Sequence, residues 1–494
     1  MRNAPHLITY VDRLGGGTMD TIHSILDGPL QGAFAGVHLL PFYAPFDGAD
    51  AGFDPRDHTA VDPRLGDWES LRAIGNDYEV MADLIVNHVS DESPQFLDFA
   101  AHGEASPYNG MFLEYSSHFE PDDERAGLIY RPRPGPPFTD KTMADGSVRR
   151  MWTTFTPHQI DIDVTSPAAY GYLMSVLDRF AASGVSNVRL DAVGYAVKKA
   201  GTRCFMIPET IELIQQLGSE INDRGMESLL EIHSHYEDQI EASKIAERVY
   251  DFALAPLLLH ALYTGDASAL ERWLAVSPRN AVTVLDTHDG IGVIDVGPDA
   301  DKAGLLTPPQ IDEVVEGIHS ASRGESRQAT GAAASNLDLY QVNCTYYSAL
   351  GCDNNRFLLA RLVQFLSPGV PQVYYAGMLA ARNDLELLDR TGVGRDINRP
   401  YYTLDAVGRA MSRPVVRRQL ELARWRNRET VFRGDFAVLD SAAQELAIRW
   451  SHEGRTLDAR LDFGDPGFQI VIEDGGTTTE LTGWDDFASV TSTR

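Results

Sequence analysis

The chain has 494 residues, which is long enough for one large domain with smaller satellites. Acidic residues outnumber basic ones by 71 to 42, giving a formal net charge of −29, and such a surface repels nucleic acid and anionic membranes. The three cysteines have neither metal-site spacing nor the even number of a disulfide framework, which predicts a reducing, cytoplasmic location. We expect neither a signal peptide nor a membrane-spanning segment.

Short apolar runs rich in β-branched residues recur along the chain and are typical of buried parallel strands. Helical patterns lie between them: one begins at Ser166-Pro167 and ends at Ser183-Gly184, and another spans about residues 208–222. This alternation predicts an α/β fold, a (β/α)8 TIM barrel. The eight predicted strands are residues 7–10, 36–42, 80–87, 185–191, 229–233, 249–254, 281–286 and 371–375.

Two gaps in this alternation are too long for ordinary loops. Residues 89–164 are rich in Pro, Gly, Ser and aromatic residues, show little helical periodicity, and are expected to form an inserted domain B. Residues 291–355, with a Gly/Ala/Ser tract at 329–335, are expected to form a second inserted domain, B′. Alternating patterns predict a small all-β C-terminal domain at 433–494. The barrel is then built from residues 1–88, 165–290 and 356–432.

Three carboxylates follow apolar runs in the middle of the chain: Asp191, Glu231 and Asp289. Barrel enzymes build their active sites at the C-terminal ends of the strands, where these acids are predicted to lie. Arg189, His233 and His288 stand beside them in the sequence. Acids, an arginine and histidines in this arrangement indicate a site that makes and breaks glycosidic bonds.

Four short segments carry a resemblance to a known family. In chain order they are residues 83–88 (Asp-Leu-Ile-Val-Asn-His), 189–193 (Arg-Leu-Asp-Ala-Val), 230–233 (Leu-Glu-Ile-His) and 285–289 (Leu-Asp-Thr-His-Asp). The chain thereby resembles the α-amylase superfamily, glycoside hydrolase family 13. Further segments at 45–54, 130–135, 334–341 and 394–399 resemble the sucrose phosphorylase family within it.

The resemblance implies a retaining, double-displacement reaction. Asp191 is the expected nucleophile, and Arg189, on the same face of the strand, is expected to keep it ionised. Glu231 is the expected general acid/base, which protonates the leaving group and later takes a proton from the acceptor. Asp289 is expected to grip the 2- and 3-hydroxyls of the sugar.

The resemblance also implies the remaining binding residues. For the glucosyl unit it implies hydrogen bonds, a charge clamp and apolar walls from His88, His288, Gln159, Asp50, Arg395, Phe53 and Phe155. For the acceptor it implies phosphate contacts from Arg133, His233 and Tyr340, and fructose contacts from Asp338 and Gln341. The small-residue tract would let the loop at 329–341 move and exchange Asp338 for Tyr340. Each of three of these residues also has a structural interpretation. Phe155 could equally be an ordinary core residue, Gln159 a residue of a solvated loop, and Arg133 part of a solvated Pro-Arg loop.

The expected reaction converts sucrose and phosphate to α-D-glucose 1-phosphate and D-fructose, with transglucosylation of other acceptors. The alternatives are a sibling phosphorylase acting on sucrose 6′-phosphate, glucosylglycerol or glucosylglycerate, and an α-glucoside hydrolase. A catalytically silent barrel serving as a binding or transporter subunit is disfavoured by the three acids. The resemblance also allows a homodimer.

We expect no cofactor and no required metal. Asn87 matches a position that many amylases use to bind structural calcium, but residues 89–164 show no convincing carboxylate cluster to complete such a site. Gly15-Gly16-Gly17 lacks both the Lys-Ser/Thr ending of a phosphate loop and the spacing of a dinucleotide fingerprint, so it predicts a plain turn.

Overall fold

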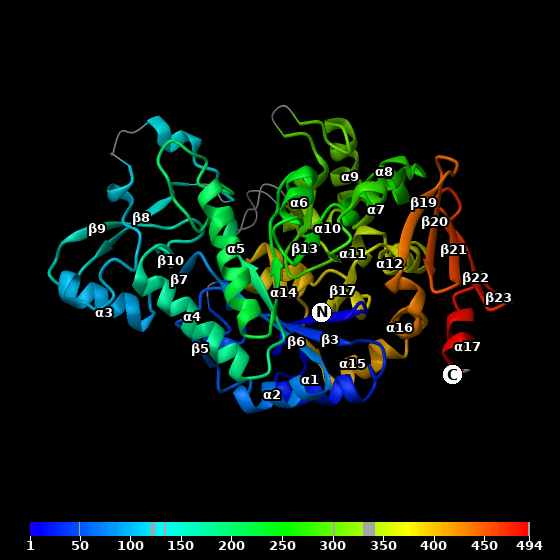
Figure 1. Cartoon of the computed structure of the whole chain (residues 1–494), viewed down its shortest axis with the longest axis horizontal. Coiled ribbons are helices and arrows are strands. Elements are labelled where there is room, and N and C mark those ends of the chain that lie inside the picture. Colours follow the sequence, from blue (N-terminus) through cyan, green and yellow to red (C-terminus); the bar gives the residue numbers. More distant parts are fainter. Residues whose placement is uncertain (49, 120–123, 133–134, 300–301, 330–340, 493–494) are drawn as a thin grey trace.

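The computed structural model describes residues 1–48, 50–119, 124–132, 135–299, 302–329 and 341–492. Eight parallel strands close into a barrel, and helices surround it (Figure 1), which confirms the predicted (β/α)8 fold. The order around the barrel is β1 (His6–Thr9), β17 (Val370–Tyr374), β14 (Ala281–Thr283), β13 (Arg248–Asp251), β12 (Glu227–Leu230), β11 (Asn187–Asp191), β6 (Glu79–Ile85) and β3 (Gly36–Leu39).

Each predicted strand coincides with one barrel strand, but several end earlier than predicted. β12 ends at Leu230 instead of residue 233, and β14 ends at Thr283 instead of residue 286. The chain beyond these strands stays buried after it leaves the sheet, as at Ile232 and Leu285, so its apolar residues prolong the strand-like pattern. Asp191 is therefore the last residue of its strand, whereas Glu231 and Asp289 lie in the turns that follow β12 and β14.

The two helices predicted from start and stop signals are present. α4 (Pro167–Ala182) begins after Ser166, whose side chain accepts a hydrogen bond from Ala169 N, and α5 spans Pro208–Asp223. The leucine run that begins at Leu254, predicted as the end of a strand, is instead the start of α7 (Leu254–Thr264). Its residues are nearly all buried, so no polar face distinguished a helix from a strand.

The segment between β6 and β11 forms a lobe beside the barrel, coloured cyan in Figure 1. β7 (His88–Ser90) pairs antiparallel with β10 (Gln159–Asp161), and β8 (Phe138–Thr142) forms a hairpin with β9 (Val148–Trp152). The lobe also contains α3 (Pro94–His102), a helix that the sequence pattern did not predict. The limits given for domain B stay a prediction.

The second long insertion begins with β15 (Ile291–Gly292), which pairs antiparallel with β16 (Gln341–Val342). Between them lie the short helix η5 (Ile294–Val296), α9 (Pro308–Ala321) and α10 (Glu325–Gln328). This pairing places Gln341 beside the turn that carries Asp289. Most of the tract at 329–335, together with Asp338 and Tyr340, lies outside the described residues.

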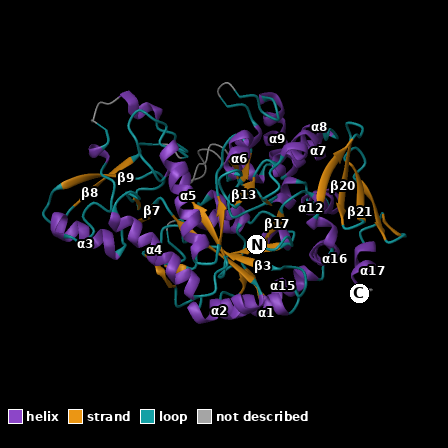
Figure 2. Ribbon diagram, viewed as in Figure 1, coloured by secondary structure: helices purple, strands orange, loops and turns teal. Residues whose placement is uncertain are grey.

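The C-terminal part is an antiparallel five-stranded sheet, as predicted, and Figure 2 shows it at the side of the barrel away from the inserted lobe. Trp450 joins the two parts because its indole Nε1 donates to the carbonyl of Leu366 at 2.8 Å. None of the helices in the described ranges has the length and hydropathy of a membrane span. The strands are β19 (Asp435–Leu439), β20 (Glu445–His452), β21 (Arg455–Asp462), β22 (Gly467–Asp474) and β23 (Thr477–Leu481).

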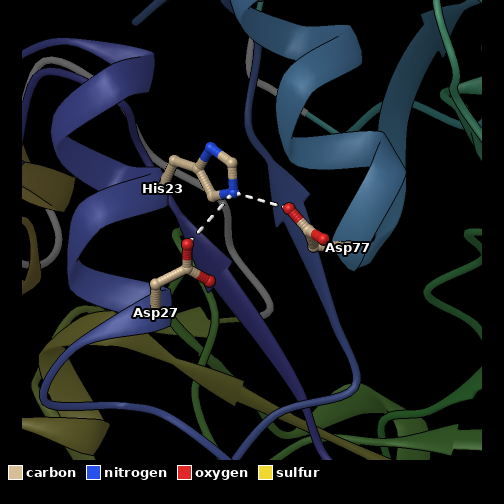
Figure 3. A group of neighbouring side chains, drawn as sticks. All are labelled: His23, Asp27 and Asp77. Carbon is tan, nitrogen blue, oxygen red and sulfur yellow. Dashed lines mark hydrogen bonds and ion pairs between the residues drawn. The ribbon is translucent and has the colours of Figure 1, made fainter.

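One histidine links the first two helices of the barrel, α1 (Met19–Asp27) and α2 (Trp68–Asp77) (Figure 3). Nε2 of His23 lies 3.1 Å from Asp77 Oδ2 and 3.5 Å from Asp27 Oδ2. Both acids are more than half exposed, so solvent screens this interaction. The cluster is best explained as a surface contact between neighbouring helices.

A buried lysine fastens the inserted lobe to the barrel. Nζ of Lys198 lies 2.8 Å from Asp161 Oδ2 on β10 and donates to Asn87 Oδ1, also at 2.8 Å. The lysine and aspartate side chains are almost fully buried. Asn87 is the residue that resembles a calcium ligand, and an ammonium group already occupies its side-chain oxygen. These residues therefore do not fit a calcium site of the expected kind.

We predict that Lys198→Met lowers the free energy of unfolding by about 3–5 kcal/mol, because it leaves the buried Asp161 carboxylate without its cation. Denaturant titration of the variant measures the loss. Lys199→Met is the matched control: its side chain is exposed and pairs with Glu209, so stability should hardly change. If a chelator lowered the stability of the unmodified protein, a bound metal ion and not Lys198 would be what compensates the charge of Asp161.

Candidate active site

A pocket opens beyond the C-terminal ends of the barrel strands, which is where barrel enzymes build their active sites. Most of the residues predicted for the site meet there. They are Asp50, Phe53, His88, Phe155, Gln159, Asp191, Glu231, His233, His288, Asp289, Gln341 and Arg395. Arg133, Asp338 and Tyr340 lie outside the described residues.

Arg189 lies beneath the pocket and holds several acids at once. Its NH1 is 2.5 Å from Asp83 Oδ1 and 2.7 Å from Asp191 Oδ1, and its NH2 is 3.6 Å from Glu231 Oε1. Burial alone would lower the pKa of Arg189, but the carboxylates of Asp83 and Asp191 raise it well above its ordinary value. On the other side of Asp83, His38 Nε2 lies 2.8 Å from Oδ2.

The Arg189 contacts are unequal for the two acids that were predicted to be catalytic, Asp191 and Glu231. Burial raises the pKa of Asp191; Arg189 opposes this shift, and the nearby Glu231 reinforces it. Arg189 lies 2.7 Å from Asp191 but 3.6 Å from Glu231, so its positive charge stabilises the Asp191 carboxylate more than the Glu231 carboxylate.

The turn after β11 positions both acids. Ala192 has a positive φ of 55°, an uncommon backbone conformation for a residue with a side chain. In this conformation its N–H donates to Glu231 Oε2 at 3.2 Å. The residue that follows the expected nucleophile therefore holds the expected acid/base in place.

Asp289 is held ionised by a cation of its own. Burial alone would raise its pKa, but the guanidinium of Arg395, 2.8 Å from Oδ1, lowers the pKa well below its ordinary value. The backbone of this turn is also fixed. Asn398 Nδ2 donates to the carbonyl of Asp289 at 2.7 Å, and Arg399 Nε to that of His288 at 2.8 Å. Sequence reasoning missed these two supports, although the segment at 394–399 contains them.

The wall expected to contact glucose is a set of packed rings and hydrogen bonds. Phe53 stacks on His288 with ring centres 4.8 Å apart and planes 7° apart. Burial lowers the pKa of His288 to about 3, so this ring is neutral at physiological pH. Gln159 Nε2 donates to Asp50 Oδ2 at 3.3 Å and lies 3.0 Å from His88 Nε2. Gln159 is thus a buried residue of β10 and part of this wall, not a solvated loop residue.

The pocket also contains aromatic residues that the sequence analysis did not single out. Tyr130, Tyr195 and Phe205 line the pocket, with Tyr195 and Phe205 in contact at 4.7 Å between ring centres. Tyr130 lies in the segment at 130–135, which offered a signal; Phe205 lies in a loop that offered none. Gln341 Oε1 accepts from Gly290 N at 3.0 Å, which ties β16 to the turn of Asp289.

The pocket acids do not need a metal ion to balance their charge. Ligand atoms of Glu231, His233 and Asp289 lie within 4.8 Å of one another, a spacing that could hold a cation. Asp289, however, is already paired with Arg395, and Glu231 accepts from Ala192 N. We therefore interpret the cluster as an acid/base site.

Comparison with known proteins agrees with this geometry. The model "Alpha amylase, catalytic domain" matches residues 11–254. A sucrose phosphorylase of Agrobacterium vitis is 56% identical over 91% of this chain and 93% of its own length. One from Bifidobacterium adolescentis is 51% identical over 99% of this chain and 97% of its own length.

A solved structure is also closely similar. The crystal structure of sucrose 6F-phosphate phosphorylase from Thermoanaerobacter thermosaccharolyticum superposes with a TM-score of 0.90 at 34% identity, covering 98% of each chain. Sequence identity at this level over nearly the whole length shows common membership of a family and not only a shared fold. The chain therefore belongs to the α-amylase family of enzymes, in its sucrose phosphorylase branch.

Proposed function

We propose that the protein is a retaining sucrose phosphorylase, which converts sucrose and phosphate to α-D-glucose 1-phosphate and D-fructose. One observation carries the mechanism: Arg189 pairs more closely with Asp191 than with Glu231. A nucleophile must be ionised and an acid must hold a proton, and this asymmetry supplies both from two carboxyl groups.

In the first step the Asp191 carboxylate attacks the anomeric carbon of the glucosyl unit. The bond from this carbon to the fructosyl oxygen breaks, and Glu231 gives its proton to that oxygen, so fructose leaves neutral. Asp289, held ionised by Arg395, binds the sugar hydroxyls and stabilises the positive charge that develops on the ring.

In the second step phosphate replaces fructose. Glu231, now ionised, takes a proton from the incoming phosphate, and a phosphate oxygen attacks the anomeric carbon of the β-glucosyl-Asp191 ester. The ester bond breaks and α-glucose 1-phosphate forms with net retention. Arg133, His233 and Tyr340 are the proposed phosphate contacts, Asp338 and Gln341 the proposed fructose contacts, and other hydroxyl acceptors give transglucosylation.

We also propose a cytoplasmic location, which the three free cysteines support. The high negative charge argues against nucleic acid and anionic membranes as partners. A homodimer, expected from the resemblance alone, stays a prediction that a measurement of molecular mass in solution tests.

The deciding experiment is incubation with sucrose, with and without phosphate. We expect glucose 1-phosphate to be the main product when phosphate is present, with little free glucose. Equal glucose release under both conditions would make the protein a hydrolase. Inertness on sucrose but turnover of sucrose 6′-phosphate, glucosylglycerol or glucosylglycerate with phosphate would make it a sibling phosphorylase.

Asp191→Asn should lower turnover by at least about a thousandfold without unfolding the protein, because the attacking carboxylate is lost. Initial rates and circular dichroism measure the two effects. Asp178→Asn, an exposed position on α4, is the control and should keep full activity. Substantial activity in a folded Asp191→Asn protein would reject the nucleophile assignment.

Glu231→Gln should block turnover of sucrose far more than turnover of α-D-glucosyl fluoride, because fluoride departs without needing a proton. The measurement is the ratio of the two rates in the variant and in the unmodified enzyme. If both substrates lose activity equally, Glu231 is not the general acid.

Arg395→Met should move the acidic limb of the pH–activity profile to higher pH by about one to three pH units. Without the guanidinium the pKa of Asp289 rises from its depressed value. As pH falls, Asp289 is therefore protonated at a higher pH than in the unmodified enzyme, and activity is lost there. Arg390→Met, at an exposed position nearby, is the control. An acidic limb that stays in place would show that Asp289 does not depend on Arg395 for its charge.

A further inference from the structure

A fully buried carboxylate, Asp295, stands behind the acceptor side of the pocket on η5. Its Oδ2 lies 3.5 Å from His233 Nδ1, which is an ion-pair distance. Its Oδ1 accepts from Gln239 Nε2 at 2.9 Å and from Ser234 N at 3.2 Å. N–H groups can only donate, so these contacts suit an ionised carboxylate.

The surroundings hold the His233 ring in one orientation. The ring stacks on Phe252 with centres 3.8 Å apart and planes 17° apart. A Cβ atom on Gly292 would stand 2.9 Å from Asp295 Oδ2 and 3.7 Å from His233 Nδ1, so only glycine leaves room for this pair. With Nδ1 directed at Asp295, the ring turns Nε2 toward the pocket, where it lies 3.8 Å from Glu231 Oε1.

We propose that Asp295 is a positioning residue that keeps His233 as an imidazolium, so that the acceptor subsite presents a fixed cationic donor to phosphate. A neutral ring that donates from Nδ1 to Asp295 would offer phosphate only a lone pair at Nε2. An imidazolium donates from both nitrogens, and charge-assisted hydrogen bonds are the strong ones for phosphate. The inference rests on the proposed phosphorylase function.

The charges around His233 support the same protonation state. Burial alone would lower the pKa of His233, but the hydrogen bond and charge of Asp295, followed by the charges of Glu231 and Asp289, raise it to about 9. Behind Asp295 stands Asp251 on β13, whose carboxylate accepts from Trp273 Nε1. Of the three acids that raise the pKa of His233, Asp295 has the largest effect, and it is the only one of the three without a role in the proposed reaction.

The test is Asp295→Asn, compared by nuclear magnetic resonance titration of histidine-labelled protein and by phosphate KM at several pH values. His233→Gln assigns the His233 signal. We expect the pKa of His233 to fall by about one to three pH units. Phosphate KM should rise roughly five- to thirtyfold at pH 7.5 and much less at pH 6, while the rate with α-D-glucosyl fluoride in the first half-reaction changes little.

Two further variants keep the test decisive. Gly292→Ala retains both titratable groups but crowds Asp295. It should therefore lower the pKa of His233 and raise phosphate KM, as Asp295→Asn does. Asp238→Asn is the control: this acid binds Ser234 Oγ at 2.6 Å and, unlike Asp295, is not among the groups that shift the pKa of His233, so both readouts should stay unchanged.

The outcomes separate the inference from the proposed function. An unchanged His233 titration in Asp295→Asn, or a rise in phosphate KM that is the same at every pH, would overturn the role of Asp295. If the unmodified enzyme makes no glucose 1-phosphate from sucrose and phosphate, the proposed function fails instead, while the titration still reports the coupling between Asp295 and His233.

Discussion

The guanidinium of Arg189 is the group on which the site depends. It lies inside the barrel and joins Asp83 of β6, Asp191 of β11 and Glu231 in the turn after β12. Buried acids at this spacing would repel one another and take up protons without a cation between them. The barrel supplies that cation from β11, the strand that also carries the proposed nucleophile, so one residue compensates acids from β6, β11 and the turn after β12.

Two of the three histidines that line the pocket, His288 and His233, illustrate how burial and charge give one residue type different properties. Burial leaves His288, stacked on Phe53, neutral on the side proposed to bind glucose. His233, stacked on Phe252, faces Asp295 and stays charged. A neutral ring suits a sugar, whose hydroxyls need both donors and acceptors, whereas a cation suits phosphate. The carboxylate of Asp295 beside His233 therefore gives the two histidines the different charges that their proposed ligands require.

Local patterns predicted most of the fold and the residues at the strand ends. Buried β-branched runs located all eight barrel strands, and the acid motifs located Asp191, Glu231 and Asp289. The ends of β12 and β14 were misjudged because buried apolar residues, such as Ile232 and Leu285, continue into the turns that follow these strands. α3 was missed because Pro, Gly and aromatic residues surround it, although Ser93 and Pro94 form an ordinary helix start.

Local sequence patterns could not predict the buried ion pairs, because the partners come from distant parts of the chain. Lys198 pairs with Asp161 of β10 and also donates to Asn87, which lies 111 residues away in the sequence. No local pattern marks Lys198 or Asp161 as partners. Asp295 lies in an insertion whose sequence offered no strand or helix signal near it, and its relation to His233 arises only when β15 brings Gly292 against the turn after β12. Such pairs follow from tertiary packing, so they become visible only in three dimensions.

The interior of this acidic chain assigns a separate cation to each of several buried acids. Asp161 forms an ion pair with Lys198, Asp286 with Arg361 at 3.3 Å, and Asp289 with Arg395. Asp251 is held by neutral donors instead, and burial raises its pKa to about 6. Glu231 differs from the paired acids, since its contacts are a backbone N–H and the more distant edge of Arg189. A carboxyl group with weaker cationic compensation suits a residue that gains and loses a proton during turnover, and this supports the acid/base role that we propose for Glu231.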